Sequence, residues 1–249
     1  MIISYGKQSI DSTDINSVVK SLKSNYLTQG PLVNKFETNL KKKLNCKFAT
    51  VVSNASAALY LSGKIFNWKS GDLIAVSPIT FISSVNCIEH CSAKPLFVDI
   101  SLEDYCMDPK LLEMELKKDK LKKIKAAIIT DYGGQPAKWK EFYRIKKKYK
   151  IKLINDNCHA LGSSIDNNKG YAAKYADIVT LSFHPVKAIT TGEGGALLTN
   201  NKEIDEKANL LRQHGIARKK NTHWKYEVNN LGYNFRLPDI NCALGISQL

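Results

Sequence analysis

The chain has 249 residues, 43% of them hydrophobic, which predicts one large domain with a sizeable buried core. No stretch approaches the roughly 18 consecutive apolar residues of a membrane span, and the amino terminus shows no signal-peptide pattern. None of the six cysteines forms a CxxC pair, so no metal site is expected. We therefore expect a cytoplasmic protein with no membrane partner.

The formal net charge of +14 raises nucleic acid as a partner, because basic surfaces attract phosphate backbones. Almost all of this positive charge is lysine, whereas arginine is preferred for planar, bidentate phosphate recognition. The densest run, KKDKLKKIK at 117–125, is assigned to a helical pattern ending before a strand, with its lysines on a solvated face. We therefore expect no nucleic-acid partner, but a positive field that attracts an anionic substrate.

Short apolar runs alternate with amphipathic stretches along the chain. Strands are predicted at FATVV (48–52), DLIAVS (72–77), KPLFVDI (94–100), AAIITD (126–131), KLIND (152–156), DIVTLS (177–182) and ALLTN (196–200). Helices are predicted in most of the gaps, including 56–66, 82–91, 139–150 and 202–214. This alternation is typical of an α/β fold with a mostly parallel sheet covered on both faces. Ligands of such sheets bind beyond the carboxyl ends of the strands, so polar residues there are candidate site residues.

The first two strand ends have features of a ligand site. Small residues, SNASAA at 53–58, follow the first strand, and such a turn leaves backbone N–H groups free for phosphate. Serine and asparagine are also ordinary helix caps, so this signal is ambiguous. After the second strand, Phe81 is either a ring-stacking aromatic or a core residue.

Two later strand ends carry titratable residues. Asp156 ends KLIND, and a carboxylate there must face a cation, a metal or a protonated ring nitrogen, or else cap a helix or form a salt bridge. Ser182 ends DIVTLS and precedes Lys187, which is framed by apolar neighbours. Desolvation makes such an amine nucleophilic, although a surface lysine is the alternative. The glycines at 192, 194 and 195 allow close backbone approach beside Lys187.

Together these features form the set of parts that a pyridoxal phosphate site needs. The parts are a phosphate loop, a stacking aromatic, a carboxylate for the ring nitrogen, a serine for the phosphate and a lysine for the aldehyde. Each feature alone has an ordinary structural explanation, and it is the combination that favours the cofactor.

The sequence resembles the DegT/DnrJ/StrS family of sugar aminotransferases, which are pyridoxal phosphate enzymes of the aspartate aminotransferase fold. The matching segments span nearly the whole chain: LTQGP (27–31), SNASAAL (53–59), SPITF (77–81), NDNCHALG (155–162), SFHPVKAITTGEGG (182–195) and GYNFRLPDINCALG (232–245). The resemblance implies a three-layer α-β-α, fold type I large domain over residues 1–249. It further implies that the family's small C-terminal domain is missing from this chain.

The resemblance also implies roles for the residues around the cofactor ring. Lys187 is implied to be the catalytic Schiff-base lysine, and Asp156 to pair with the pyridinium nitrogen. His159 is implied to lie near the ring hydroxyl, and Phe81 to stack on the ring.

Other matched residues are implied to bind the phosphate and the substrate. Ala55, Ser56 and Ser182 are implied to hold the cofactor phosphate, although the family usually has Gly-Thr at 55–56. Asn234 is implied to reach the phosphate of the neighbouring subunit, so a homodimer with a shared active site is expected. Substrate-binding residues are expected at Tyr5, Thr28, His184 and Arg236.

Two segments are most similar to the branch of the family in pseudaminic acid biosynthesis, HPVKAITTGEGG and LGYNFRLPDINCALGISQL. That similarity implies a UDP-4-keto-6-deoxy-N-acetylamino sugar aminated at C4, with L-glutamate as amino donor. Three alternatives stay open: an aminotransferase acting at C3 or C4 of another nucleotide sugar, an inactive cofactor-binding fragment, and a basic non-catalytic protein that binds nucleic acid. A related sugar dehydratase is disfavoured, because such relatives have histidine where this chain has Lys187.

Overall fold

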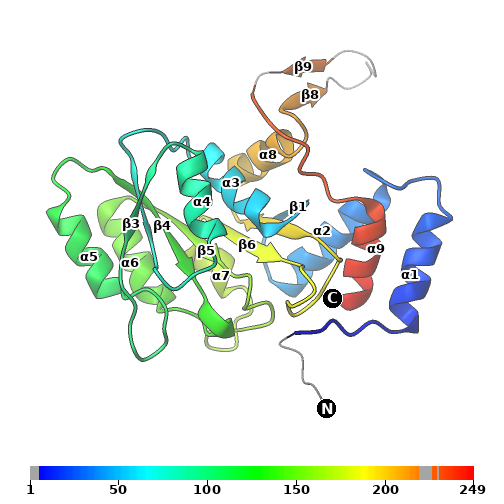
Figure 1. Ribbon diagram of the computed structural model, residues 1–249, viewed down its shortest axis with the longest axis horizontal. Helices are drawn as coiled ribbons and strands as arrows, with labels where there is room; N and C mark the ends of the chain where they lie inside the picture. Colours follow the sequence, from blue (N-terminus) through cyan, green and yellow to red (C-terminus); the bar gives the residue numbers. More distant parts are fainter. Residues whose placement is uncertain (1–5, 219–225, 229) are drawn as a thin grey trace.

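The centre of the fold is a seven-stranded sheet (Figure 1). A computed structural model describes residues 6–218, 226–228 and 230–249. The strands are β1 (Phe48–Val52), β2 (Leu73–Val76), β3 (Lys94–Phe97), β4 (Ile124–Thr130), β5 (Lys152–Asp156), β6 (Ile178–Ser182) and β7 (Gly195–Thr199). Their order is β1-β7-β6-β5-β4-β2-β3, and within this sheet only β7 runs antiparallel to its neighbours. The predicted strands and the mostly parallel sheet are therefore confirmed.

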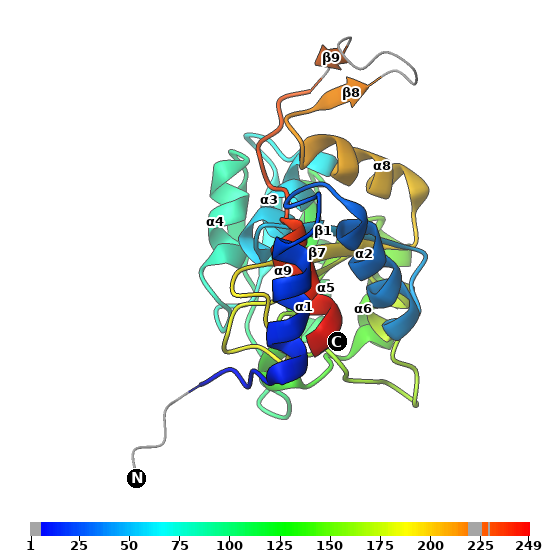
Figure 2. The ribbon, with the colours of Figure 1, turned by 90° about the vertical axis from the view of Figure 1, so that its right-hand side faces the viewer.

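Helices cover both faces of this sheet (Figures 1 and 2). One face packs on α3 (Ala55–Ile65), α4 (Ser83–His90) and α8 (Lys202–Leu211), and the other on α2 (Pro31–Lys43), α5 (Pro109–Lys118), α6 (Trp139–Tyr149) and α7 (Tyr171–Tyr175). Because side chains alternate along a strand, Ile154 enters the first core and Leu153 the second. This is the three-layer α-β-α arrangement expected from the sequence.

Two further units lie at the periphery of the fold. α1 (Ser12–Leu22) packs on α9 (Asp239–Gln248), which also packs on α2 (Figure 2). The hairpin of β8 (Ile216–Arg218) and β9 (Tyr226–Val228) projects beyond α8 (Figure 1). Within the ranges that the structure describes, no helix has both the length and the hydropathy of a membrane span.

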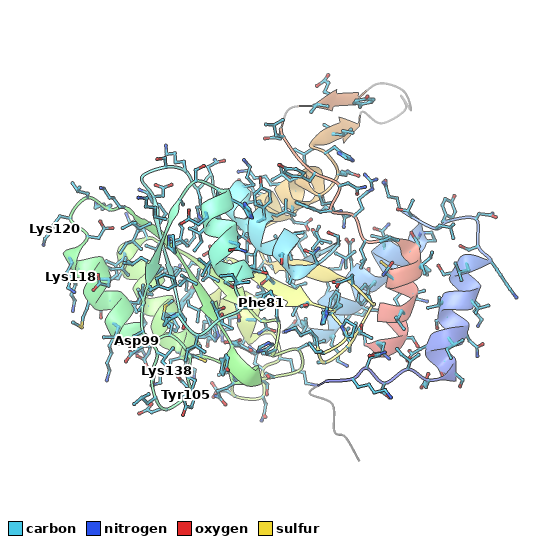
Figure 3. The ribbon with its side chains drawn as sticks, in the orientation of Figure 1. Phe81, Asp99, Tyr105, Lys118, Lys120 and Lys138 are labelled. Carbon is cyan, nitrogen blue, oxygen red and sulfur yellow. The ribbon has the colours of Figure 1, made fainter. Side chains whose placement is uncertain are left out.

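The basic run at 117–125 is not the helix that the sequence predicts. α5 ends at Lys118, and residues 119–123 form a turn in which the Asp119 carboxylate accepts the N–H groups of Lys123 and Ile124. The lysines of the run are exposed, as predicted, and Lys118 and Lys120 lie at one end of the molecule (Figure 3). The run precedes β4, so it lies at the opposite edge of the sheet from the carboxyl ends where ligands bind.

A buried carboxylate connects two segments that are far apart in the sequence. Asp239, at the start of α9, accepts the backbone N–H groups of Gly30 (2.6 Å) and Leu32 (2.9 Å). Its own N–H donates to the carbonyl of Leu27. The N-cap residue of α2, Gly30, offers no side-chain acceptor, so Asp239 caps this helix from a distance. The segments 27–31 and 232–245 are therefore in direct contact.

We predict that Asp239→Ala lowers the free energy of unfolding by about 3 kcal/mol, because two hydrogen bonds to a buried carboxylate are lost. Urea unfolding followed by circular dichroism measures this loss. Asp108 is the matched control, because it caps α5 locally through the N–H of Lys110. Asp108→Ala is expected to cost about 1 kcal/mol. Equal losses in the two variants would show that the long-range cap is worth no more than a local one.

Candidate functional site

Asp156 ends β5 as a buried carboxylate. It is 4% exposed and lies on the face of the sheet covered by α3 and α4. Ser84 of α4 donates its hydroxyl to Oδ2 (2.8 Å), and the N–H of Cys158 donates to Oδ1 (3.3 Å). No lysine, arginine or histidine of the described residues forms an ion pair with it. A buried charge of this kind is costly, so the site is suited to a cationic ligand group.

Lys187 lies in the loop that follows β6. Its N–H donates to the carbonyl of His184 (2.9 Å), which closes a tight turn, and its side chain is half-buried. The sequence frames this lysine with apolar residues and leaves two interpretations open, a desolvated amine or a surface lysine. Val186 is 45% exposed and Ala188 is also exposed, so only Ile189 enters the core. Any shielding of the amine must therefore come from groups across the site.

The charges of Lys187 and Asp156 both change the pKa of His159 and of Cys158, so these four residues lie close together. Partial loss of water around the His159 ring lowers its pKa, the Lys187 charge lowers it further, and Asp156 opposes both. His159 is still exposed to solvent, and its ring contacts the ring of Tyr132. Burial, with the Asp156 charge, raises the pKa of the Cys158 thiol well above its ordinary value, while Lys187 opposes this. His159 and Cys158 are therefore both neutral near pH 7.

The predicted phosphate loop lies at the start of α3, against the start of β7. The Asn54 side chain accepts the N–H of Ala57, and the first N–H groups of a helix lack intrahelical partners. Ser182 pairs with Gly195 across β6 and β7. A Cβ on Gly195 would come within 2.5 Å of the carbonyl carbon of Asn54 and 2.6 Å of the Ala55 nitrogen. Because Gly195 has no side chain, β7 can approach the loop at Asn54 and Ala55, and this brings Ser182 beside Ala55.

The remaining predicted residues are spread along the same edge of the sheet. Phe81, just before α4, is 69% exposed (Figure 3), so it is not a core residue. Ser56 and Ser83 share a hydrogen bond between their hydroxyls (2.7 Å) at the starts of α3 and α4. The structure therefore brings the exposed aromatic, the hydroxyls and the helix amides to one edge.

The predicted substrate residues, and Asn234 of the predicted phosphate site, are not gathered as clearly. Thr28, His184 and Asn234 are exposed, and Asn234 accepts the N–H of Arg236 at 3.4 Å. The Arg236 Nε atom is buried and has no hydrogen-bond partner in the described part of the chain. Tyr5 lies outside the described residues. The roles of these residues stay predictions.

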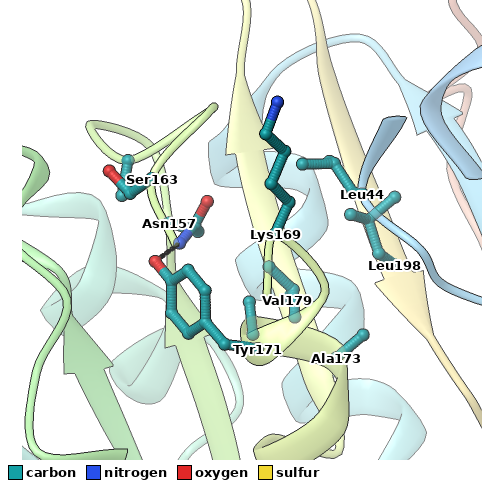
Figure 4. Close-up of a pocket in the computed structure, with 10 residues that line it drawn as sticks. Leu44, Asn157, Ser163, Lys169, Tyr171, Ala173, Val179 and Leu198 are labelled. Carbon is teal, nitrogen blue, oxygen red and sulfur yellow. Dashed lines mark hydrogen bonds between the residues drawn. The ribbon is translucent and has the colours of Figure 1, made fainter. Parts of the chain in front are cut away.

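Two concavities formed by residues that the structure describes are lined by neither Lys187 nor Asp156. The first is a small cavity of about 10 Å³ between β6, β7 and α7, large enough for about one water molecule (Figure 4). Asn157 and Tyr171 line it and are hydrogen-bonded to each other (Figure 4). The second is an open cleft of about 470 Å³ along the start of α6. Neither contains the residues predicted to bind a cofactor.

Sequence reasoning missed two residues that support the site. Ser84 binds Asp156 across 72 positions of sequence, and nothing local marks that contact. Asp131 follows β4 as Asp156 ends β5, and it is completely buried. The rule that singled out Asp156, a carboxylate at the end of an apolar strand, also applies to Asp131.

Comparison with known proteins gives the family. The model of the DegT/DnrJ/EryC1/StrS aminotransferase family matches residues 8–249. The chain belongs to this family. A UDP-4-amino-4,6-dideoxy-N-acetyl-beta-L-altrosamine transaminase of Campylobacter jejuni is 41% identical over 248 residues, which are 100% of this chain and 64% of that protein.

Solved structures show the same relationship. The aminotransferase PseC of Helicobacter pylori, involved in the biosynthesis of pseudoaminic acid, aligns with a TM-score of 0.91 and 33% identity over 100% of this chain and 65% of the PseC chain. A sugar aminotransferase of Streptococcus pneumoniae, solved in its PLP form, aligns with a TM-score of 0.90 and 26% identity over 100% of this chain and 66% of that one. The chain thus spans about two thirds or slightly less of the length of these relatives.

We predict opposite pKa changes at His159 when its two charged neighbours are removed. Lys187→Met raises the pKa of His159, because a nearby cation disfavours the imidazolium. Asp156→Asn lowers it, because the carboxylate favours the imidazolium. The imidazole proton resonances, followed by NMR from pH 4 to 9, measure both changes (a range of about two units either side of the ordinary value).

The control for this titration is Lys152→Met, at the other end of β5, which should leave the His159 pKa unchanged. An unchanged pKa in Lys187→Met would contradict the placement of Lys187 beside His159.

Proposed function

We propose that this chain carries the cofactor-binding and catalytic residues of a pyridoxal phosphate-dependent nucleotide-sugar aminotransferase. The observation that carries the proposal is the buried Asp156 carboxylate, which forms no ion pair with any residue that the structure describes and acts with Lys187 on the pKa of His159. A ring nitrogen that is protonated when bound would supply the missing positive charge. Family membership supports the same conclusion.

The residues at this edge fit the cofactor part by part. Asp156 would hold the ring nitrogen, and exposed Phe81 would cover one face of the ring. The amides at the start of α3, with the hydroxyls of Ser56 and Ser182, would hold the phosphate, since helix N-termini favour anions. Neutral His159 would lie beside the ring without adding a second positive charge.

Lys187 has two tasks in the proposed reaction. The cofactor, when bound, supplies an electron sink that stabilises negative charge on the substrate carbon. The Lys187 amine would hold the cofactor aldehyde in the resting enzyme, and it would also move a proton at the reacting carbon of the substrate. Its position in a loop, with exposed neighbours Val186 and Ala188, leaves the side chain room to swing between these tasks.

For the substrate we propose a UDP-4-keto-6-deoxy-N-acetylamino sugar aminated at C4, with L-glutamate as donor. The product would be UDP-4-amino-4,6-dideoxy-N-acetyl-beta-L-altrosamine, the sugar named in the transaminase relatives at 35–41% identity. Because those relatives are longer than this chain, the activity requires a direct assay of the chain itself.

The first expected result is spectroscopic. The purified chain mixed with pyridoxal phosphate should develop a visible band from the lysine-bound cofactor, and glutamate should convert that band to the amine form. Lys187→Ala should abolish the band, because no other group is proposed to bind the aldehyde. Lys169→Ala is the control, since that lysine is exposed and lies at the cavity of Figure 4.

Each outcome of this experiment has a distinct meaning. A band that ignores glutamate would identify a cofactor-binding fragment that cannot turn over. No band in a folded chain, with salt-sensitive binding to DNA, would favour the basic nucleic-acid-binding protein instead. Mass spectrometry of products from UDP- and GDP-linked 4-keto sugars then tests the substrate: amination of the GDP sugar alone would overturn the UDP assignment.

We also propose a homodimer in which Asn234 of one subunit reaches the phosphate site of the other. Asn234 is exposed and lies on the stretch that follows the projecting β8–β9 hairpin, which supports this (Figure 1). Mixing Lys187→Ala with Asn234→Ala subunits should restore turnover, because each mixed dimer contains one site with both residues intact. Mixtures of two Lys187→Ala preparations should stay inactive. No recovery in verified mixed dimers would contradict the shared site.

A further inference from the structure

Asp131 lies behind Asp156, on the opposite face of the sheet. It follows β4, whose last residue, Thr130, pairs with Asp156 of β5. Successive side chains of a strand point to opposite faces, so Asn155 and Asn157 point away from the side of Asp156 and toward Asp131. Asp131 is completely buried and forms no ion pair within the described part of the chain.

Five hydrogen-bond donors converge on the Asp131 carboxylate, divided between its two oxygens. Oδ1 accepts the N–H of Ala137 (2.9 Å) and the indole N–H of Trp139 (2.8 Å), both at the start of α6. Oδ2 accepts the Tyr171 hydroxyl (2.6 Å) and the side-chain amides of Asn157 (2.8 Å) and Asn155 (3.0 Å). One oxygen therefore holds a helix, and the other holds the end of β5.

Tyr171 completes the group around Oδ2. Its hydroxyl also accepts a hydrogen bond from the Asn157 amide (2.9 Å), so Asn157 is fixed by two partners. Burial, followed by the charge of Asp131, raises the pKa of Tyr171, which therefore stays protonated and donates. Burial raises the pKa of Asp131 overall, and the hydrogen-bond donors offset only part of that rise. Five donors around two oxygens nevertheless match an ionised carboxylate, which has acceptors only.

The main chain adds a third connection to β5. The N–H of Asp131 donates to the carbonyl of Asp156 (3.1 Å). The two neighbours of Asp156 are thus held by the side chain of Asp131, and Asp156 itself by the Asp131 backbone. The direction of the Asp156 carboxylate depends on the backbone at 155–157, which these contacts immobilise.

We propose that Asp131 is a positioning residue for Asp156, acting through Asn155 and Asn157. This inference rests on the proposed function, because it assigns Asp131 a task only if Asp156 binds the cofactor ring. Oδ2 and Tyr171 hold the residues on either side of Asp156, whereas Oδ1 contacts only the start of α6. If Asp131 had a purely structural role, loss of a hydrogen bond to either oxygen would change cofactor affinity equally.

Two substitutions separate these roles. Tyr171→Phe and Trp139→Phe each remove one side-chain donor to Asp131, from Oδ2 and Oδ1 respectively. Tyr171→Phe should raise the dissociation constant of pyridoxal phosphate about tenfold, the loss typical when an outer partner of a site ligand is removed. Trp139→Phe should change it by less than about twofold, although it lowers the melting temperature through the space left in the core.

The measurement is a titration of the purified chain with pyridoxal phosphate, followed by the visible band across pH 5–9 (about two units either side of neutrality, a range that includes the titration of histidine). Tyr171→Phe should also shift the pH dependence of that band, since the ring nitrogen loses a well-aimed carboxylate. Asp131→Asn should weaken binding at least as much as Tyr171→Phe. If Asp131→Asn does not fold, the pair of phenylalanine variants still decides.

The outcomes separate failure of this inference from failure of the proposed function. Equal changes in dissociation constant for Tyr171→Phe and Trp139→Phe would overturn the positioning role, as would an unchanged constant in Tyr171→Phe. An unmodified chain that forms no visible band would instead overturn the proposed function itself.

Discussion

The site depends on one constraint, a carboxylate buried at the end of a parallel strand that forms no ion pair within the described residues. Asp156 is held by a serine hydroxyl and a backbone N–H, which orient it without neutralising it. Such a group costs stability unless a ligand provides positive charge. The fold therefore maintains an unfavourable charge at the place where a cationic ring is proposed to bind, which is typical of preorganised sites.

The sheet separates the tasks of orienting this carboxylate and supporting it. The pleat sends Asp156 toward α3 and α4, where the proposed ligand groups lie, and sends its neighbours toward α6 and α7. Support from Asp131 thus reaches β5 from behind, without occupying space on the ligand side. The reversed strand β7 contributes in another way, since Gly195 allows β6 and β7 to approach the loop at Asn54 and Ala55.

Much of this arrangement could be predicted from the sequence, because it follows from local patterns. Apolar runs located all seven strands of the sheet, and the rule about strand ends located Asp156, Ser182 and the start of α3. The environment of Lys187 could not be decided from the sequence, because apolar neighbours in sequence do not enclose a residue in an exposed loop. Contacts such as Ser84 with Asp156, or Asp239 with Gly30, join distant positions and have no local signature.

The large positive charge also has a structural explanation that the composition alone does not provide. In alternating strand–helix folds, the helices begin at the ligand edge of the sheet and end at the opposite edge. Lysines occupy the last turns of α2, α5 and α6, where they complement the negative ends of the helix dipoles. The start of α3 faces the other way and offers its positive end to the proposed phosphate site. The lysines of these three last turns therefore stabilise helix ends at the far edge, while attraction for an anionic ligand comes from backbone amides at the near one.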